Sequence, residues 1–257
     1  MSVDRADVTD TLHRSRVLIR HNVALVLRDV YPVASYLVMP MVLMLVLRPL
    51  YVNALDDGLM QVVVGPVVMV SVLSLHLVGN LVVVEREWGT WDRLRGSRAS
   101  IVEMMLGKAV PAGLLLLAQL VVPFAFGYLV IGLPLPAAPV QLFGAMLLWT
   151  ACLLSLGYAV AAVVRSRAQM GAVADIGALL LSALGGALLP VGLMPGWAQV
   201  LAHVSPGYWA IALMRAASDG DVHAALLPAV VLLVITVVVG AFAAQRFSRR
   251  RDHSFAL

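Results

Sequence analysis

The chain has 257 residues, of which 61% are hydrophobic and only 12% are charged, and its mean hydropathy is +0.95. An average soluble domain carries about 25% charged residues, so too few charges remain here to cover a folded core with a water-exposed surface. The composition excludes an ordinary soluble protein and predicts an integral membrane protein. The single cysteine, Cys152, excludes an internal disulfide.

Residues 1–29 are expected to form an amphipathic helix that lies along the membrane surface. Ile19 and Val23 belong to an apolar face at helical spacing, whereas Arg14 and His21 belong to a charged face that repeats every seventh residue. A solvated leader continuous with the first membrane helix is the alternative.

Long runs without charged residues predict six membrane-spanning helices, because about 20 apolar residues cross a bilayer. The run 109–164 is too long for one crossing, and its prolines between 133 and 139 end helices, so it divides into two. The whole chain, 1–257, is then one all-α transmembrane domain. The predicted helices span residues 30–50, 58–84, 105–132, 139–164, 168–190 and 224–246.

The basic residues lie almost entirely on one side of this predicted topology. Of the 18 Lys and Arg residues, only Arg48 and Arg215 fall on the other side. Lys and Arg near helix ends stay on the cytoplasmic side, so we expect both termini in the cytoplasm. The basic residues behind the formal charge of +4 are then expected to contact anionic lipid headgroups. No nucleic-acid partner is expected, because the sequence has no basic groove with interleaved aromatic residues.

One short charged segment, residues 82–108, lies between two apolar runs and holds four acidic and five basic residues. Thr90 and Gly96 are placed to cap and end a short helix, and Ser100 with Glu103 forms a capping box that starts the next one. The pattern predicts either a docking element for a protein partner or a solvated loop. The segment also carries three large apolar side chains amid its charges: Trp88, Trp91 and Leu94.

Two segments resemble a known family. Residues 85–108, "EREWGTWDRLRGSRASIVEMMLGK", are similar to the loop between the second and third helices of ABC-2 type transporter permeases, with its Glu, Gly-Thr, Leu and Gly-Lys. Residues 185–221, with their Pro-x-Trp and Ser-Pro, look like the family's segment after the fifth helix. Within the family, the chain is nearer to small drug-exporter permeases of the daunorubicin-resistance type than to polysaccharide exporters.

The resemblance implies six crossings with an N-terminal elbow helix, a cytoplasmic coupling helix, and short re-entrant outer helices between helices five and six. The coupling helix would dock into a separate ATPase subunit, present in two copies, beside a second permease that is identical or related. This chain lacks G-x-x-x-x-G-K-[ST], so ATP and Mg²⁺ are expected in the partner ATPase and no cofactor in this chain. The implied ATPase-coupling residues are Glu85, Glu87, Trp88, Gly89, Thr90, Trp91, Arg93, Leu94 and Arg95.

Polar residues inside the bilayer are candidates for a substrate path or an intramembrane polar network. Asp175 is the only carboxylate in the fifth apolar run, where it can pair with Arg165 or Arg167, bind a cationic group of a substrate, or pack as a neutral acid. His76 and Asn80 are one turn apart on the second helix. They can face Asp175, face the partner permease, or form a hydrogen bond between helices.

Residues 189–221 carry few charges and two turn-forming regions, which predicts short helices on the outer side. These helices would form an outer gate above the substrate path, or else an ordered loop without a gating role. The gate candidates are Pro190, Pro195, Trp197, Pro206 and Tyr208.

The sequence therefore predicts the permease half of an ATP-driven exporter in a bacterial plasma membrane. Its substrate would be amphiphilic, such as a drug, a lipid or a lipid-linked glycan, and import stays open. An autonomous channel or secondary transporter is the alternative, although no internal repeat is evident. A membrane-embedded enzyme is a third class, but H-E-x-x-H and G-x-S-x-G do not occur, so we expect no catalytic residue and no metal site.

Overall fold

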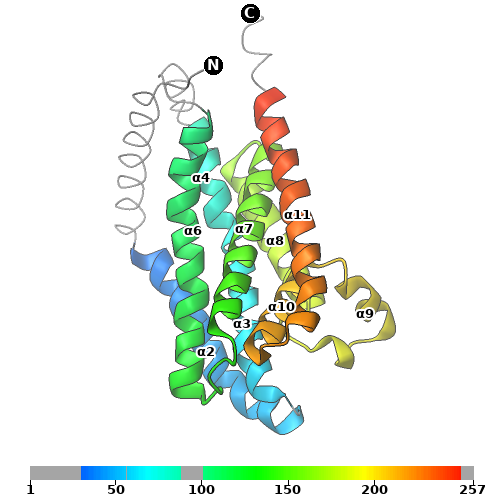
Figure 1. Cartoon of the computed structure of the whole chain (residues 1–257). Coiled ribbons are helices and arrows are strands. Elements are labelled where there is room, and N and C mark those ends of the chain that lie inside the picture. Colours follow the sequence, from blue (N-terminus) through cyan, green and yellow to red (C-terminus); the bar gives the residue numbers. More distant parts are fainter. Residues whose placement is uncertain (1–29, 56, 88–100, 250–257) are drawn as a thin grey trace, which may run out of the picture.

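The computed structural model describes residues 30–55, 57–87 and 101–249, and within these ranges all regular structure is helical (Figure 1). The predicted all-α membrane fold with six crossings is confirmed. The interfacial helix expected over residues 1–29 lies outside the described residues. Six helices are long and apolar enough to cross a membrane: Ala34–Ala54, Gly58–Asn80, Ala109–Ile131, Pro139–Val163, Arg167–Leu184 and Val222–Phe247.

The second crossing forms the centre of the bundle. It consists of two helices, α3 (Gly58–Leu73) and α4 (Leu75–Glu87), which meet at Ser74. Its apolar stretch is 78% buried, against 17% for the first crossing, α2 (Val30–Ala54). α3 packs against α2, α6 (Ile101–Phe126), α8 (Arg167–Leu184) and α10 (Pro206–Asp219). α4 packs chiefly against α7 (Pro139–Val163) and α8, so this crossing has neighbours from distant parts of the chain.

The third and fourth crossings are joined at the end of the bundle that also holds the α2–α3 turn. α6 (Ile101–Phe126) continues as one π-helical turn, Gly127–Ile131, and ends at Gly132, whose φ of 86° favours glycine. α7 (Pro139–Val163) begins with Pro139, as predicted, because proline is tolerated in the first helical turn. The sixth crossing, α11 (Val222–Arg249), packs along α7.

The fifth crossing is shorter than predicted. α8 (Arg167–Leu184) starts after Ser166, whose hydroxyl accepts a hydrogen bond from the backbone N–H of Gln169 at 3.3 Å. The sequence predicted an end at residue 190, and this was wrong because Gly185 and Gly186 turn the chain. Gly186 has a φ of 86°, a conformation that stops an α-helix.

Short helices follow α8, as the sequence predicted. A 3₁₀ turn, Val191–Leu193, precedes α9 (Gly196–Ala202), and α10 (Pro206–Asp219) then leads into α11. Figure 1 shows α9 projecting sideways from the bundle and α10 lying against it. The C-terminal ends of α4 and α11 lie at the same end of the bundle. The α2–α3 turn and α10 lie at the other end.

Candidate transport site

Small residues let α4 and α8 approach each other closely. The Cβ that an alanine would add at Gly171 would lie 3.3 Å from Cε1 of His76, and one added at Gly79 would lie 1.9 Å from Cε of Met170. Glycine at such contacts allows helix backbones to pack closely within a membrane. This contact places the polar residues of α4 beside those of α8.

His76 and Asp175 form a polar pair on this α4–α8 face. Nδ1 of His76 lies 3.8 Å from Oδ1 of Asp175, which is longer than a direct hydrogen bond. The His76 side chain is 36% exposed and that of Asp175 is 64% exposed, so the pair opens onto the surface of the bundle. The partner that the structure gives to Asp175 is thus His76.

Asn80 lies one turn beyond His76 on α4, as the sequence predicted. Its Oδ1 is buried and has no hydrogen-bond partner among the described residues. An unsatisfied buried acceptor is costly, so a donor that reached this oxygen would be stabilised there. Of the three predicted path residues, the structure pairs His76 with Asp175 and leaves Asn80 as a separate open acceptor.

A second polar site lies at the opposite end of the bundle, and sequence reasoning missed it. The guanidinium group of Arg215, on α10, donates to Oδ2 of Asp57 and to Oε1 of Gln61 on α3. Nε2 of Gln61 donates in turn to the carbonyl oxygen of Gly186 at 2.8 Å. We call Asp57, Gln61 and Arg215 the outer clamp, because together they join α3, α10 and the loop after α8 at the end of the bundle that the sequence predicts to be the outer one.

Two further hydrogen bonds hold the same loop. The Tyr51 hydroxyl, on α2, donates to the carbonyl oxygen of Leu188. The Ser205 hydroxyl, just before α10, donates to the carbonyl oxygen of Leu181 at 2.7 Å. Residues 189–204, which include α9, therefore lie between two anchored points.

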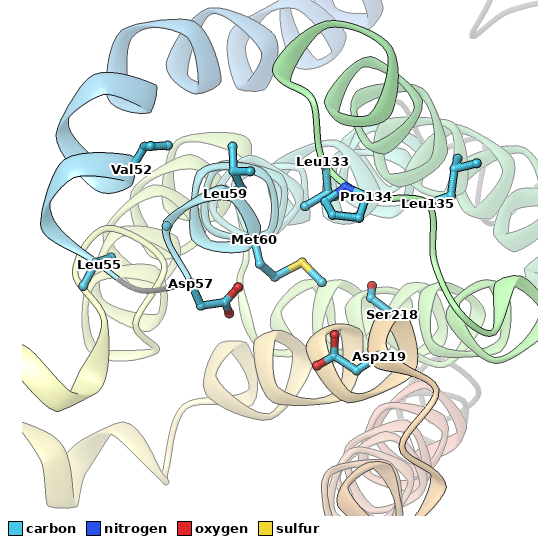
Figure 2. A pocket seen from close by; sticks show the side chains of 11 residues that line it. Val52, Leu55, Asp57, Leu59, Met60, Leu133, Pro134, Leu135, Ser218 and Asp219 are labelled. Carbon is cyan, nitrogen blue, oxygen red and sulfur yellow. The ribbon is translucent and has the colours of Figure 1, made fainter.

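A cavity of about 290 Å³ lies beside the outer clamp. Figure 2 shows the Asp57 and Asp219 carboxylates with Met60 between them along one side, and apolar side chains along the other. The volume is at the lower limit for small-molecule sites, which measure about 300–1,000 Å³. The apolar wall is formed mainly by Val52, Leu55, Leu59, Leu133, Pro134 and Leu135.

The five predicted gate residues do not form one cluster. Pro190 and Pro195 directly precede the 3₁₀ turn and α9, and Trp197 on α9 is 66% exposed. Pro206 is instead buried at the start of α10, and Tyr208 packs against two neighbouring aromatic rings. The gate role of all five stays a prediction.

The predicted coupling residues fall almost entirely outside the described residues. α4 includes Glu85 and ends at Glu87, and α6 begins at Ile101, directly after the predicted capping residue Ser100. The coupling role of the whole set stays a prediction. The members outside the described residues are Trp88, Gly89, Thr90, Trp91, Arg93, Leu94 and Arg95.

A six-helix bundle with an exposed ionisable pair on two of its apolar crossings has the properties of a transporter's membrane domain. Residues 14–218 match the sequence profile of the ABC-2 type transporter family, and the chain belongs to this family. The resemblance seen in the sequence is thereby confirmed. Together, family and fold make the chain a multi-pass transmembrane subunit of an ABC transporter.

Two curated relatives support the same assignment. The chain is 27% identical over 195 residues to the "Probable multidrug ABC transporter permease YbhR" of Escherichia coli strain K12, and equally to that of Escherichia coli O157:H7. The alignment covers 74% of this chain and 52% of each relative. The chain thus spans about half the length of the curated relatives it matches.

Proposed function

We propose that this chain is the permease half of an ATP-driven exporter that moves an amphiphilic substrate out across a bacterial plasma membrane. The complex would contain two ATPase subunits, which bind ATP and Mg²⁺, and a second permease. The observation that carries the proposal is the exposed His76–Asp175 pair within a chain of this family. The relatives' name, a probable multidrug permease, supports an amphiphilic substrate.

The surroundings of Asp175 support a protein-lined path. Its neighbours on the exposed side of α8 are apolar, as at Val173, Ile176 and Leu179. An ionisable side chain at membrane depth is stable when it faces another protein or a water-filled cavity, because lipid cannot solvate it. We therefore place the second permease opposite this face of α4 and α8, with the substrate path between the two copies.

The same pair suggests which substrates bind best. Asp175 is separated from His76 by more than a hydrogen-bond length, so its carboxylate can accept a hydrogen bond from a cationic group. The apolar residues around it suit the remainder of an amphiphile. A drug with an amine fits this site well, and a lipid or lipid-linked glycan would use chiefly the apolar part.

Charge at the site is tested by comparing Asp175→Asn with Asp175→Glu in proteoliposomes that contain the complete complex. Loss of one charged hydrogen bond predicts about tenfold slower ATP-driven transport of a fluorescent dye with a primary ammonium group in the Asn variant, with recovery in the Glu variant. Transport of a neutral dye of similar size should change little. Equal slowing of both dyes would refute a direct contact with the cation.

Coupling is tested by co-expressing the chain with the ATPase encoded beside it and measuring co-purification and ATP hydrolysis. We expect two variants to lose assembly with the ATPase or substrate-stimulated ATP hydrolysis. Leu94→Asp introduces a charge at the proposed apolar docking surface, and Glu87→Ala removes a residue that matches the family's motif. Leu94→Met is the control and should retain both. Undiminished activity of all variants would refute the coupling role, and full transport without the ATPase would favour a channel or secondary transporter.

A further inference from the structure

We propose that Arg215 and Gln61 are positioning residues for transport, because the outer clamp fixes the loop after α8 against α3. The outer end of α3, the helix α10 and residues 185–188 then move as one body during the transport cycle. This inference rests on the proposed function for its transport role, whereas the clamp itself can be tested in the permease alone.

Gln61 is the buried centre of the outer clamp. Its side chain is only 1% exposed, and all of its polar groups are used. Nε2 donates to the carbonyl oxygens of Gly186 at 2.8 Å and Ala187 at 3.5 Å, and Oε1 accepts from Arg215. Separation of α3 from the loop would leave several buried polar groups without partners, which is strongly unfavourable.

The backbone contact beside Gln61 is equally tight. Gly65 lies one turn further along α3, and a Cβ added there would be 2.3 Å from the carbonyl oxygen of Ala187. No space for even one methyl group exists between the two backbones. The loop is therefore packed against α3 as well as hydrogen-bonded to it.

Arg215 connects this loop to α10 through its branched guanidinium group. One nitrogen reaches Asp57 and the other reaches Gln61, a two-point contact that the single ammonium group of lysine does not reproduce. The Asp57 side chain is 65% exposed, so the ion pair alone adds little stability in water. Its effect is to orient the guanidinium group so that it satisfies the buried Gln61.

The clamp has a consequence for the outward opening. α3 and α10 are joined at their outer ends, so the exit does not open between them. The segment 189–204 is different, because its side chains at Trp197, Val200 and Val204 are exposed and it lies between the two anchored points. Outward release therefore occurs beside this segment or between the two permeases, while the clamp stays closed.

Transport through a covalently closed clamp tests this directly. In Asp57→Cys/Arg215→Cys, transport should fall about tenfold because the clamp is lost. A bifunctional thiosulfonate that bridges the two cysteines rejoins α3 to α10, although Oε1 of Gln61 still lacks its guanidinium donor, so bridging should raise transport above that of the unbridged variant. Cys152 is fully buried, and the wild-type chain treated with the reagent is the control. If bridging abolishes the transport that the unbridged variant retains, the clamp must open and the proposal is wrong.

Hydrogen exchange in the purified permease tests the clamp without an ATPase. The backbone N–H of Ala187 donates to the carbonyl oxygen of Ser182 at 3.1 Å and reports on the anchored loop. Arg215→Met and Gln61→Leu should each speed its exchange by about tenfold, and Arg215→Lys should have an intermediate effect, while exchange in α7 stays unchanged. Unchanged exchange at Ala187 would overturn the clamp even if ATP-driven transport were confirmed. Faster exchange with normal transport would overturn its role in transport.

Discussion

Replacing Gly65 by alanine should destabilise the protein, although alanine is the better helix former. The added Cβ would lie 2.3 Å from the Ala187 carbonyl oxygen, and ordinary contacts begin at 3.4 Å, so the loop must move by about 1 Å. If it moves directly away, the distance from Gln61 Nε2 to the Gly186 carbonyl oxygen grows from 2.8 Å to about 3.8 Å, and that hydrogen bond is lost.

The free-energy cost follows from three contributions. Overpacking costs about 1–3 kcal/mol. The lost hydrogen bond costs about 1 kcal/mol. The greater helix propensity of alanine returns at most about 1 kcal/mol, because the ring of Pro66 crowds the Cβ of the residue before it. The net loss of unfolding free energy is about 1–4 kcal/mol.

Thermal melting of the detergent-purified chain measures this loss, at about 2–4 °C per kcal/mol for a chain of this size. Gly144→Ala is the matched control, because its added Cβ meets no atom within 4 Å and α7 should gain helix propensity. Gly144→Ala should melt at or above the wild-type temperature, and Gly65→Ala several degrees below it. If Gly65→Ala melts with the control, the close packing of the loop on α3 is refuted.

Three further changes are checked with the same melting assay. Trp149→Phe should cost about 1–3 kcal/mol, because the fully buried indole N–H donates to the Ser71 hydroxyl at 2.9 Å, and a double-mutant cycle with Ser71→Ala should show coupling. Gly132→Ala should cost about 1 kcal/mol from its φ of 86° alone, since no atom lies near the added methyl group. Gln119→Leu should be neutral within about 1 kcal/mol, because its buried Nε2 has no partner among the described residues, and the Ser74 hydroxyl, which donates to Gln119 Oε1 at 2.6 Å, can donate instead to the Val70 carbonyl oxygen 3.2 Å away.

Local signals in the sequence were sufficient to predict the membrane-spanning helices. Six apolar runs of bilayer length gave six helices, and Pro139 marked the start of α7 because proline fits a first helical turn. The end of α8 was missed, since an uncharged run does not distinguish a helix from the apolar loop that follows it. The adjacent glycines at 185 and 186 were the signal, and the φ of 86° at Gly186 stops the helix.

Contacts between distant residues could not be predicted in the same way. Asp57 and Arg215 are 158 positions apart, and Gln61 and Gly186 are 125 apart, so no local spacing connects them. Arg215 did stand out as one of two cations on the side predicted to be outer, but a single sequence does not say which residue neutralises it. The approach of His76 to Asp175 was one of several open alternatives, because it depends on the packing of α4 against α8 at Gly171.

The two ends of the molecule treat their polar groups in opposite ways, and this difference indicates where movement and binding are easiest. At the outer clamp, Gln61 is buried and fully hydrogen-bonded, so any rearrangement must break satisfied contacts. On the α4–α8 face, Asn80 has an open acceptor and the His76–Asp175 pair is longer than a hydrogen bond, so a new partner gains interactions and breaks none that are already formed. A ligand or a second permease should therefore engage this face, while the clamped end carries the resulting movement as a rigid body.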